Sequence, residues 1–335
     1  SMFSNTTGSY NVALGTSALR SNTTASNNTA VGYQAGYTNT TGNVTSLGYK
    51  ALYSNSTGSA NVALGVETLG GTTTGSNNSA IGNYALYANT TGGNNVGLGT
   101  LALRFNTTAS NNTAVGYQSL YDNTTGAQNT AVGREALANN TTASSNSAFG
   151  YQALLTNTTG EFNTAIGREA LEANTTASQN TAVGYQAGYS ATTGGSNTAM
   201  GYRSLRSLTT GSGNTALGMN SLYSSTTAVY STAVGHEALY QSTANLNTAV
   251  GFQSARSTTS GTQNDSLGAS SLFTNTTGSY NVAIGRESLY SNTTGGGNVA
   301  VGNLALNSNT TADHNVAIGR DALRLNTTGG NSTVV

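Results

Sequence analysis

The chain has 335 residues, of which 7% are charged, with a formal net charge of zero, 43 Gly and no Pro, Cys or Trp. Nucleic acid and anionic membranes require clustered Lys and Arg, so this sparse, balanced charge excludes both classes of partner. No apolar run approaches the about 18 residues of a membrane helix, so we expect no membrane insertion by this segment.

A glycine that closes the sequence Asn-Thr-Ala-Val-Gly, or a close variant, recurs throughout the chain. Sixteen of the eighteen intervals between these glycines are 17 residues long, and two are 16. A short fixed period is typical of a solenoid, in which each unit stacks on the next. We therefore expect residues 1–335 to form one uninterrupted repeat domain, a fragment of a longer fibre, folded as an all-β parallel β-solenoid of about 19 coils. The nineteen anchor glycines are Gly15, Gly32, Gly48, Gly65, Gly82, Gly99, Gly116, Gly133, Gly150, Gly167, Gly184, Gly201, Gly218, Gly235, Gly251, Gly268, Gly285, Gly302 and Gly319.

The first predicted element of each repeat is a short β-strand before the anchor, as in residues 112–116. With the anchor as position 0, a large apolar residue at −1 and usually Thr or Val at −3 share one strand face, while Ala at −2 and Gly at 0 share the other. We expect the bulky face to supply the core and the flat face to let another chain approach. The alternative is that Ala and Gly pack across the narrow interior of their own coil.

The second predicted element follows the anchor, with Ala or Ser at +3 and Leu at +4. A second strand or an irregular bend is favoured here over a single helical turn, because an isolated turn is marginal without packing. The Asn-Thr-Thr-Gly segment at +7 to +10 then predicts a corner, since Asn and Gly tolerate a left-handed backbone. Where Ala replaces this Gly, as at Ala25 and Ala109, we expect a negative φ.

Asparagine recurs at two positions of the repeat. It occupies position −4 in 17 of 19 units, including Asn112, Asn129 and Asn281, and position +7 in 13 of 19. At a strand spacing of about 4.8 Å, stacked Asn side chains can bond the copies above and below. We expect these residues and the anchor glycines to be structural.

The sequence carries no catalytic pattern. His236 and His314 are the only histidines, the acidic residues are scattered, and no nucleophile elbow or phosphate-binding loop is present. We therefore expect no enzyme activity, no cofactor and no metal. Tyrosines recur at +5, where stacked rings suit contact with a host-surface glycan or protein, or else cover a thin core. The candidate contact residues are Tyr53, Tyr87, Tyr121, Tyr223 and Tyr290.

Several repeats resemble a known family. The sequences NVALG at 11–15 and NVAIG at 281–285 and 315–319 resemble the head repeats of YadA-like trimeric autotransporter adhesins. The longer unit with Asn-Thr-Thr-Gly is similar to repeats of phage tail fibres. The resemblance implies a left-handed parallel β-roll, a homotrimer and a location outside the cell or on a virion. The repeats differ from that family in period, because its head coils are usually shorter, and residues 1–335 match neither its stalk nor its membrane anchor.

These observations predict a non-enzymatic structural and adhesive fibre segment, the shaft or head of a trimeric surface adhesin or tail fibre. The alternative is an ice-binding solenoid, because Thr pairs at +8 and +9 form regular rows. A glycan-degrading enzyme on a β-helix would need a charged cluster that interrupts the repeat. Asn-Thr-Thr is also an N-glycosylation acceptor pattern, as at Asn22, Asn106, Asn123 and Asn157.

Overall fold

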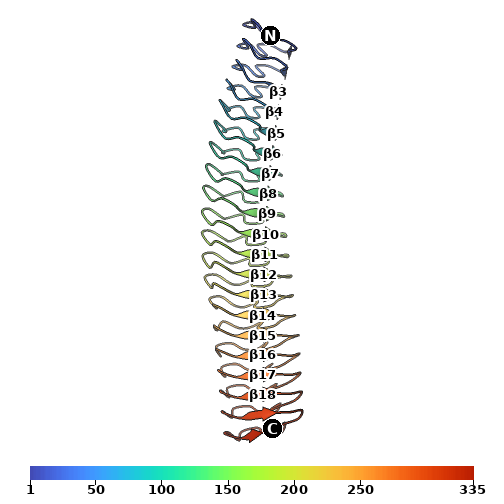
Figure 1. Cartoon of the computed structure of the whole chain (residues 1–335), viewed down its shortest axis with the longest axis vertical. Helices are drawn as coiled ribbons and strands as arrows, with labels where there is room; N and C mark the ends of the chain where they lie inside the picture. The colour runs from blue at the N-terminus through green and yellow to red at the C-terminus, as the bar shows by residue number, and fades with distance from the viewer. The chain divides into compact units, whose positions relative to one another are not determined.

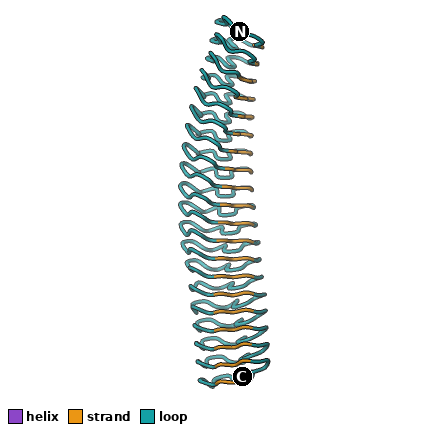
Figure 2. The backbone as a smooth tube through the Cα atoms, in the orientation of Figure 1, coloured by secondary structure: helices purple, strands orange, loops and turns teal.

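The computed structural model describes residues 1–335, and the chain divides into two units, Ser1–Ile166 and Gly167–Val335. Both contain short strands and turns with no helix (Figure 2). The first unit holds β1 (Val12–Leu14), β2 (Thr29–Val31), β3 (Val44–Leu47), β4 (Asn61–Leu64), β5 (Ser79–Ile81), β6 (Val96–Leu98), β7 (Thr113–Val115), β8 (Thr130–Val132), β9 (Ser147–Phe149) and β10 (Thr164–Ile166). The second holds β11 (Thr181–Val183), β12 (Thr198–Met200), β13 (Thr215–Leu217), β14 (Thr232–Val234), β15 (Thr248–Val250), β16 (Asp265–Leu267), β17 (Val282–Ile284), β18 (Val299–Val301), β19 (Val316–Ile318) and β20 (Thr333–Val334).

Within each unit, successive strands are parallel and stack in register with the repeat (Figure 1). In the first unit Thr113 of β7 lies opposite Thr130 of β8, and in the second Thr198 of β12 lies opposite Thr215 of β13. The predicted fold, an all-β parallel solenoid of about 19 coils with a 17-residue period, is confirmed. The single-domain organisation over 1–335 stays a prediction.

The remainder of each coil is a chain of turns that takes left-handed backbone at regular places. In the coil of Gly116 these are Gln118 at +2, Leu120 at +4 and Gln128 at +12, with φ of 53°, 50° and 60°. The segment after the anchor is therefore an irregular bend and not a helical turn. A left-handed conformation is unfavourable for Leu by about 1–2 kcal/mol, so packing of its side chain must compensate.

The corner turns at a different residue from the one expected. The residue at +10 has no left-handed φ, whether it is Gly126 or one of Ala25 and Ala109, so the negative φ predicted for the alanines is confirmed. The left-handed residue lies two positions later, as at Gln128. The side chain of Asn at +7 has another role, described below.

The interior of each coil is lined by small residues and one leucine. In the coil of Gly116, Ala114 at −2, Ser119 at +3 and Leu120 at +4 are each 0% exposed. The bulky strand face points outward instead: Leu64 and Ile81 at −1 are 40% and 45% exposed. The expectation that this face forms the core was wrong, and the alternative, small residues packed across their own coil, is correct.

The width of the interior explains this orientation. Gly97 is the one residue at −2 that has no side chain, and a Cβ added there would lie 3.3 Å from Leu86 Cδ1. An alanine methyl therefore already fills the space opposite the leucine. A valine or isoleucine turned inward would not fit.

The anchor glycines are required by both their backbone conformation and the space around them. All nineteen have φ between +126° and +140°, a region that L-residues with a side chain avoid. A Cβ on Gly116 would lie 2.5 Å from the carbonyl oxygen of Gly133 in the next coil. The same crowding holds for Gly15, Gly32, Gly133, Gly167, Gly184 and Gly285, whereas Gly319 has no anchor after it and only Ala322 Cβ at 4.0 Å.

Asparagines form two buried ladders with different hydrogen bonding. At −4, the backbone N–H of Asn129 donates to Asn112 Oδ1 at 2.9 Å, and Asn281 donates in the same way to Asn264 at 3.1 Å. At +7, Asn123 Nδ2 donates to the Oδ1 atom of Asn106 in the preceding coil at 2.8 Å. Both ladders meet at the corner, where Asn112 and Asn123 each donate to the carbonyl oxygen of Gly126 at 2.9 Å. Stacking therefore satisfies polar groups that would be costly to bury alone.

Both the +7 ladder and the interior have departures from the repeat. Thr72 occupies +7 between Asn55 and Asn89, and its buried hydroxyl has no hydrogen-bond partner; the same holds for Ser225, Ser242 and Thr258. In the interior, Ser266 replaces Ala at −2 and its hydroxyl contacts those of Ser254 and Ser271, which lie 3.0 Å from each other.

Candidate binding surfaces

An unbroken apolar row follows the outer strand face of each unit. Position −1 is Val, Ile, Leu, Met or Phe in every coil, and every one of these side chains is half-buried or exposed. In the second unit, Met200 and Ile284 are 44% and 39% exposed. Soluble monomers rarely expose contiguous apolar surface beyond a few hundred Å², and larger patches mark interaction sites. We call this feature, all residues at −1, the strand stripe.

A second surface is the row of planar side chains at +5. Rings stack at a centroid separation of 5.1 Å in the pairs Tyr37–Tyr53, Tyr223–Tyr240 and Phe273–Tyr290. Where Arg occupies +5, its guanidinium takes the place of a ring: Arg256 lies 5.1 Å from the Tyr240 centroid and 6.0 Å from that of Phe273. This arrangement, the planar row, combines aromatic stacking with cation–π contact.

The five predicted contact tyrosines all belong to the planar row, and all but Tyr87 are half-buried against their neighbours. Tyr53, Tyr223 and Tyr290 stack in parallel on the adjacent ring. Tyr87 and Tyr121 make edge contacts instead, with Tyr84 and Phe105 respectively. Tyr87 is the most exposed of the five, at 37%. The rings therefore pack mainly on one another, and the leucines at +4 are already fully buried beneath them.

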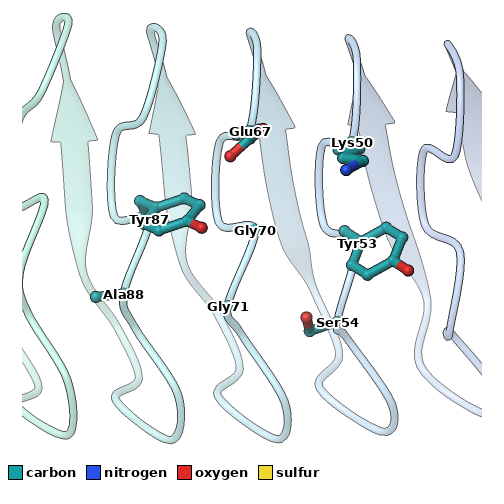
Figure 3. A pocket seen from close by; sticks show the side chains of 8 residues that line it. All are labelled: Lys50, Tyr53, Ser54, Glu67, Gly70, Gly71, Tyr87 and Ala88. Atoms are coloured by element: carbon teal, nitrogen blue, oxygen red, sulfur yellow. The ribbon is translucent and has the colours of Figure 1, made fainter.

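The planar row is interrupted at Ala138 and Leu155, and also where Gly70 occupies +5 between Tyr53 and Tyr87. The missing side chain leaves an open pocket of about 380 Å³ (Figure 3). Tyr53 and Tyr87 stand on either side of Gly70, and Lys50 and Glu67 lie along one edge. The Lys50 ammonium is 5.5 Å from the Tyr53 ring centroid, and a hydrogen bond with Tyr49 raises the pKa of Lys50. Sequence reasoning missed this pocket, although the glycine at a position usually held by a larger residue was visible.

Charged residues form ion pairs within and between coils, and they also bond neutral polar neighbours in the next coil. Arg134 contacts the adjacent Glu135 at 2.8 Å, and Gln152 of the next coil donates to Glu135 at 2.7 Å. The Gln152 hydrogen bond, with Arg134, lowers the pKa of Glu135. The residue stacked on Glu135 is thus a neutral glutamine, whereas Arg256 pairs with Glu237 of the preceding coil at 2.7 Å.

The Thr rows lie at the corner and one of them is engaged along the coil stack. Thr107 at +8 donates its hydroxyl to the carbonyl oxygen of Thr124 in the next coil at 3.1 Å. The neighbouring Thr108 at +9 is exposed. The Asn of the acceptor pattern is fully buried, as at Asn106, and its Nδ2 donates two hydrogen bonds. That nitrogen is not accessible to a glycosylating enzyme in the folded chain.

The remaining candidate groups lie apart from one another. His236 stacks on Phe252 with 5.4 Å between ring centroids, and His314 takes a left-handed position at +12. No three His, Asp or Glu side chains gather as a metal site would require. The structure has no helix long and apolar enough to cross a membrane. A scan against protein-family models found no match to this chain, and a search of curated proteins also returned none.

Proposed function

We propose that this chain is a non-enzymatic structural and adhesive fibre segment, the shaft or head of a trimeric surface adhesin or tail fibre. In this proposal three copies associate along the strand stripe and present the planar row to partners outside the cell or virion. The strand stripe is the observation that carries the proposal, because no polar residue interrupts it in either unit. Left-handed winding belongs to the same proposal and rests on the resemblance to adhesin heads.

The stripe has enough apolar area to support association. Full burial of a Leu or Ile side chain stabilises by roughly 1.5–3 kcal/mol. Leu64 and Ile81 retain 40% and 45% exposure, so covering each would contribute on the order of 1 kcal/mol. Ten such residues in the first unit alone supply a driving force comparable to that of specific complexes, before the entropic cost of association.

Three stripe substitutions test this proposal. Leu64→Thr, Ile81→Thr and Val115→Thr together keep β propensity and leave the interior unchanged, so the coils should fold. We expect self-association, measured by sedimentation equilibrium, to weaken at least tenfold. The matched control changes three exposed corner residues, Thr91→Ser, Thr108→Ser and Thr125→Ser, and should associate like the unmodified chain. Equal association of the stripe variant and the control would refute the proposal.

Ice binding receives less support from the geometry. The hydroxyl groups at +8 are engaged with carbonyl oxygens of the next coil, as in Thr107 and Thr124, and the rows lie in a turn where a flat strand would be needed. Ice binding stays an untested alternative. Measurable thermal hysteresis in a solution of the purified chain would support ice binding.

A further inference from the structure

The pocket at Gly70 is a gap of one member in the planar row. Where +5 is a ring or a guanidinium, this group can lie between its neighbours at about the spacing of the coils, as Arg206 does at 5.3 Å from Tyr189 and 5.8 Å from Tyr223. Tyr53 and Tyr87 are two coils apart, which places them roughly 10 Å from each other along the stack. One side chain of the row is therefore missing between two tyrosines, and the Tyr87 ring leans over Gly70, with Cε2 3.1 Å from the position of a Cβ there.

We propose that this gap binds a single uncharged pyranose ring of a glycan between Tyr53 and Tyr87. The proposal deepens the adhesive part of the proposed function by naming a ligand class for one position of the planar row. A pyranose has apolar C–H faces that pack on aromatic rings and an edge of hydroxyl groups that both donate and accept hydrogen bonds. The gap offers the matching surfaces: two rings, and an edge formed by Lys50 and Glu67.

The edge chemistry favours a sugar over a protein side chain. The Lys50 ammonium donates hydrogen bonds and the Glu67 carboxylate accepts them, so a group with both kinds of partner around its rim satisfies both. An arginine guanidinium would be attracted by Glu67 but repelled by Lys50. A phenylalanine ring would offer neither charged group a hydrogen bond, and a tyrosine offers only one hydroxyl. The opposite charges of the two edge residues also favour a neutral ligand.

Filling the gap is a feasible perturbation. Gly70 has no left-handed φ, and a Cβ there would lie 3.1 Å from Tyr87 Cε2, at the movable end of a side chain, and 3.2 Å from the Glu67 carbonyl oxygen. Every other coil carries a side chain at +5. We therefore expect Gly70→Tyr to fold and to occupy the proposed site. Asn307→Tyr is the matched control, because it adds a ring at +5 beside Tyr290, far along the chain from the Gly70 pocket.

The test is saturation-transfer-difference NMR on the full chain with the methyl glycosides of glucose, galactose, mannose and N-acetylglucosamine. N-acetyl-tyrosinamide and N-acetyl-argininamide serve as rival probes. We expect at least one glycoside to receive saturation at its ring C–H protons, and its affinity to fall at least tenfold in Gly70→Tyr. Asn307→Tyr should bind like the unmodified chain. Glu67→Gln, which keeps the shape of the edge, should weaken binding several-fold.

Three results would overturn the inference: no glycoside binds the unmodified chain, binding persists in Gly70→Tyr with unchanged affinity, or only a rival probe binds. Thermal unfolding followed by circular dichroism verifies that each variant is folded. The state of association is measured on the same samples. A trimer that binds no glycoside refutes the sugar site alone, whereas a monomer that binds one refutes the trimer alone.

Discussion

The substitution Gly116→Ala tests the stacking of the coils most sharply. Gly116 has φ +134°, and an alanine held there would be strained by about 1–3 kcal/mol. Its Cβ would also lie 2.5 Å from the carbonyl oxygen of Gly133, and relief of such overpacking typically costs a further 1–3 kcal/mol. The expected destabilisation is therefore about 2–6 kcal/mol, all of it at one interface between neighbouring coils.

The readout must resolve individual coils, because a solenoid can lose one interface before it unfolds completely. Hydrogen–deuterium exchange with mass spectrometry should show faster exchange in peptides that cover Gly116 and Gly133, where the N–H of Gly133 donates to Val115 O at 2.8 Å. The melting temperature should fall as well.

The control lies in the same coil. Gly126 at +10 has no left-handed φ, and the chain itself carries Ala at this position in other coils, as at Ala25 and Ala143. A Cβ on Gly126 would meet Ala143 O at 2.2 Å, so the corner must shift, but the alanine-bearing corners already accommodate a methyl group. We expect Gly126→Ala to stay within about 1 kcal/mol of the unmodified chain. If both variants exchange and melt alike, the reasoning about the anchors is wrong.

Three further changes address polar groups, each followed by denaturant or thermal unfolding. Thr72→Asn should stabilise by about 1 kcal/mol, because it completes the +7 ladder where a buried hydroxyl has no partner; no gain would contradict this. Ser266→Ala should be neutral or stabilising by up to about 1 kcal/mol, since the two remaining hydroxyls still bond each other. A clear loss would show that the cluster is needed. The hydrogen bond from Gln152 lowers the pKa of Glu135 below its ordinary value, so its stabilisation is present above the unfolded-state pKa and disappears as pH falls through the lower folded-state pKa. Glu135→Gln should therefore lose less stability between pH 6 and pH 3; an unchanged pH profile would count against this.

The sequence was sufficient for the features that depend on period alone. Regular spacing predicted parallel stacking, and a residue type that returns every 17 positions must lie over its copy, as Asn106 and Asn123 do. The burial of Leu at +4 follows in the same way. These features can be predicted without knowing the backbone conformation within one coil.

The orientation of the strand could not be predicted from alternation, which shows only that the two faces differ. Large apolar residues such as Ile81 were expected in the core because of their size. The interior is too narrow for them, because Leu86 fills it opposite the small residues at −2. The narrow interior depends on turns at left-handed residues such as Leu120. Leucine rarely adopts this conformation, so the sequence gives no signal for it. The pocket is different, because the period alone places Gly70 between Tyr53 and Tyr87 at +5, and the sequence signal was present but not used.

The mass of the particle in solution tests the proposed fibre most directly. The strand stripe leaves partly exposed apolar side chains in every coil, and the account requires that copies of the chain cover them. Sedimentation equilibrium or native mass spectrometry of the purified chain should give three times the 33.7 kDa of one chain. A stable particle of 33.7 kDa across the micromolar range would contradict the account.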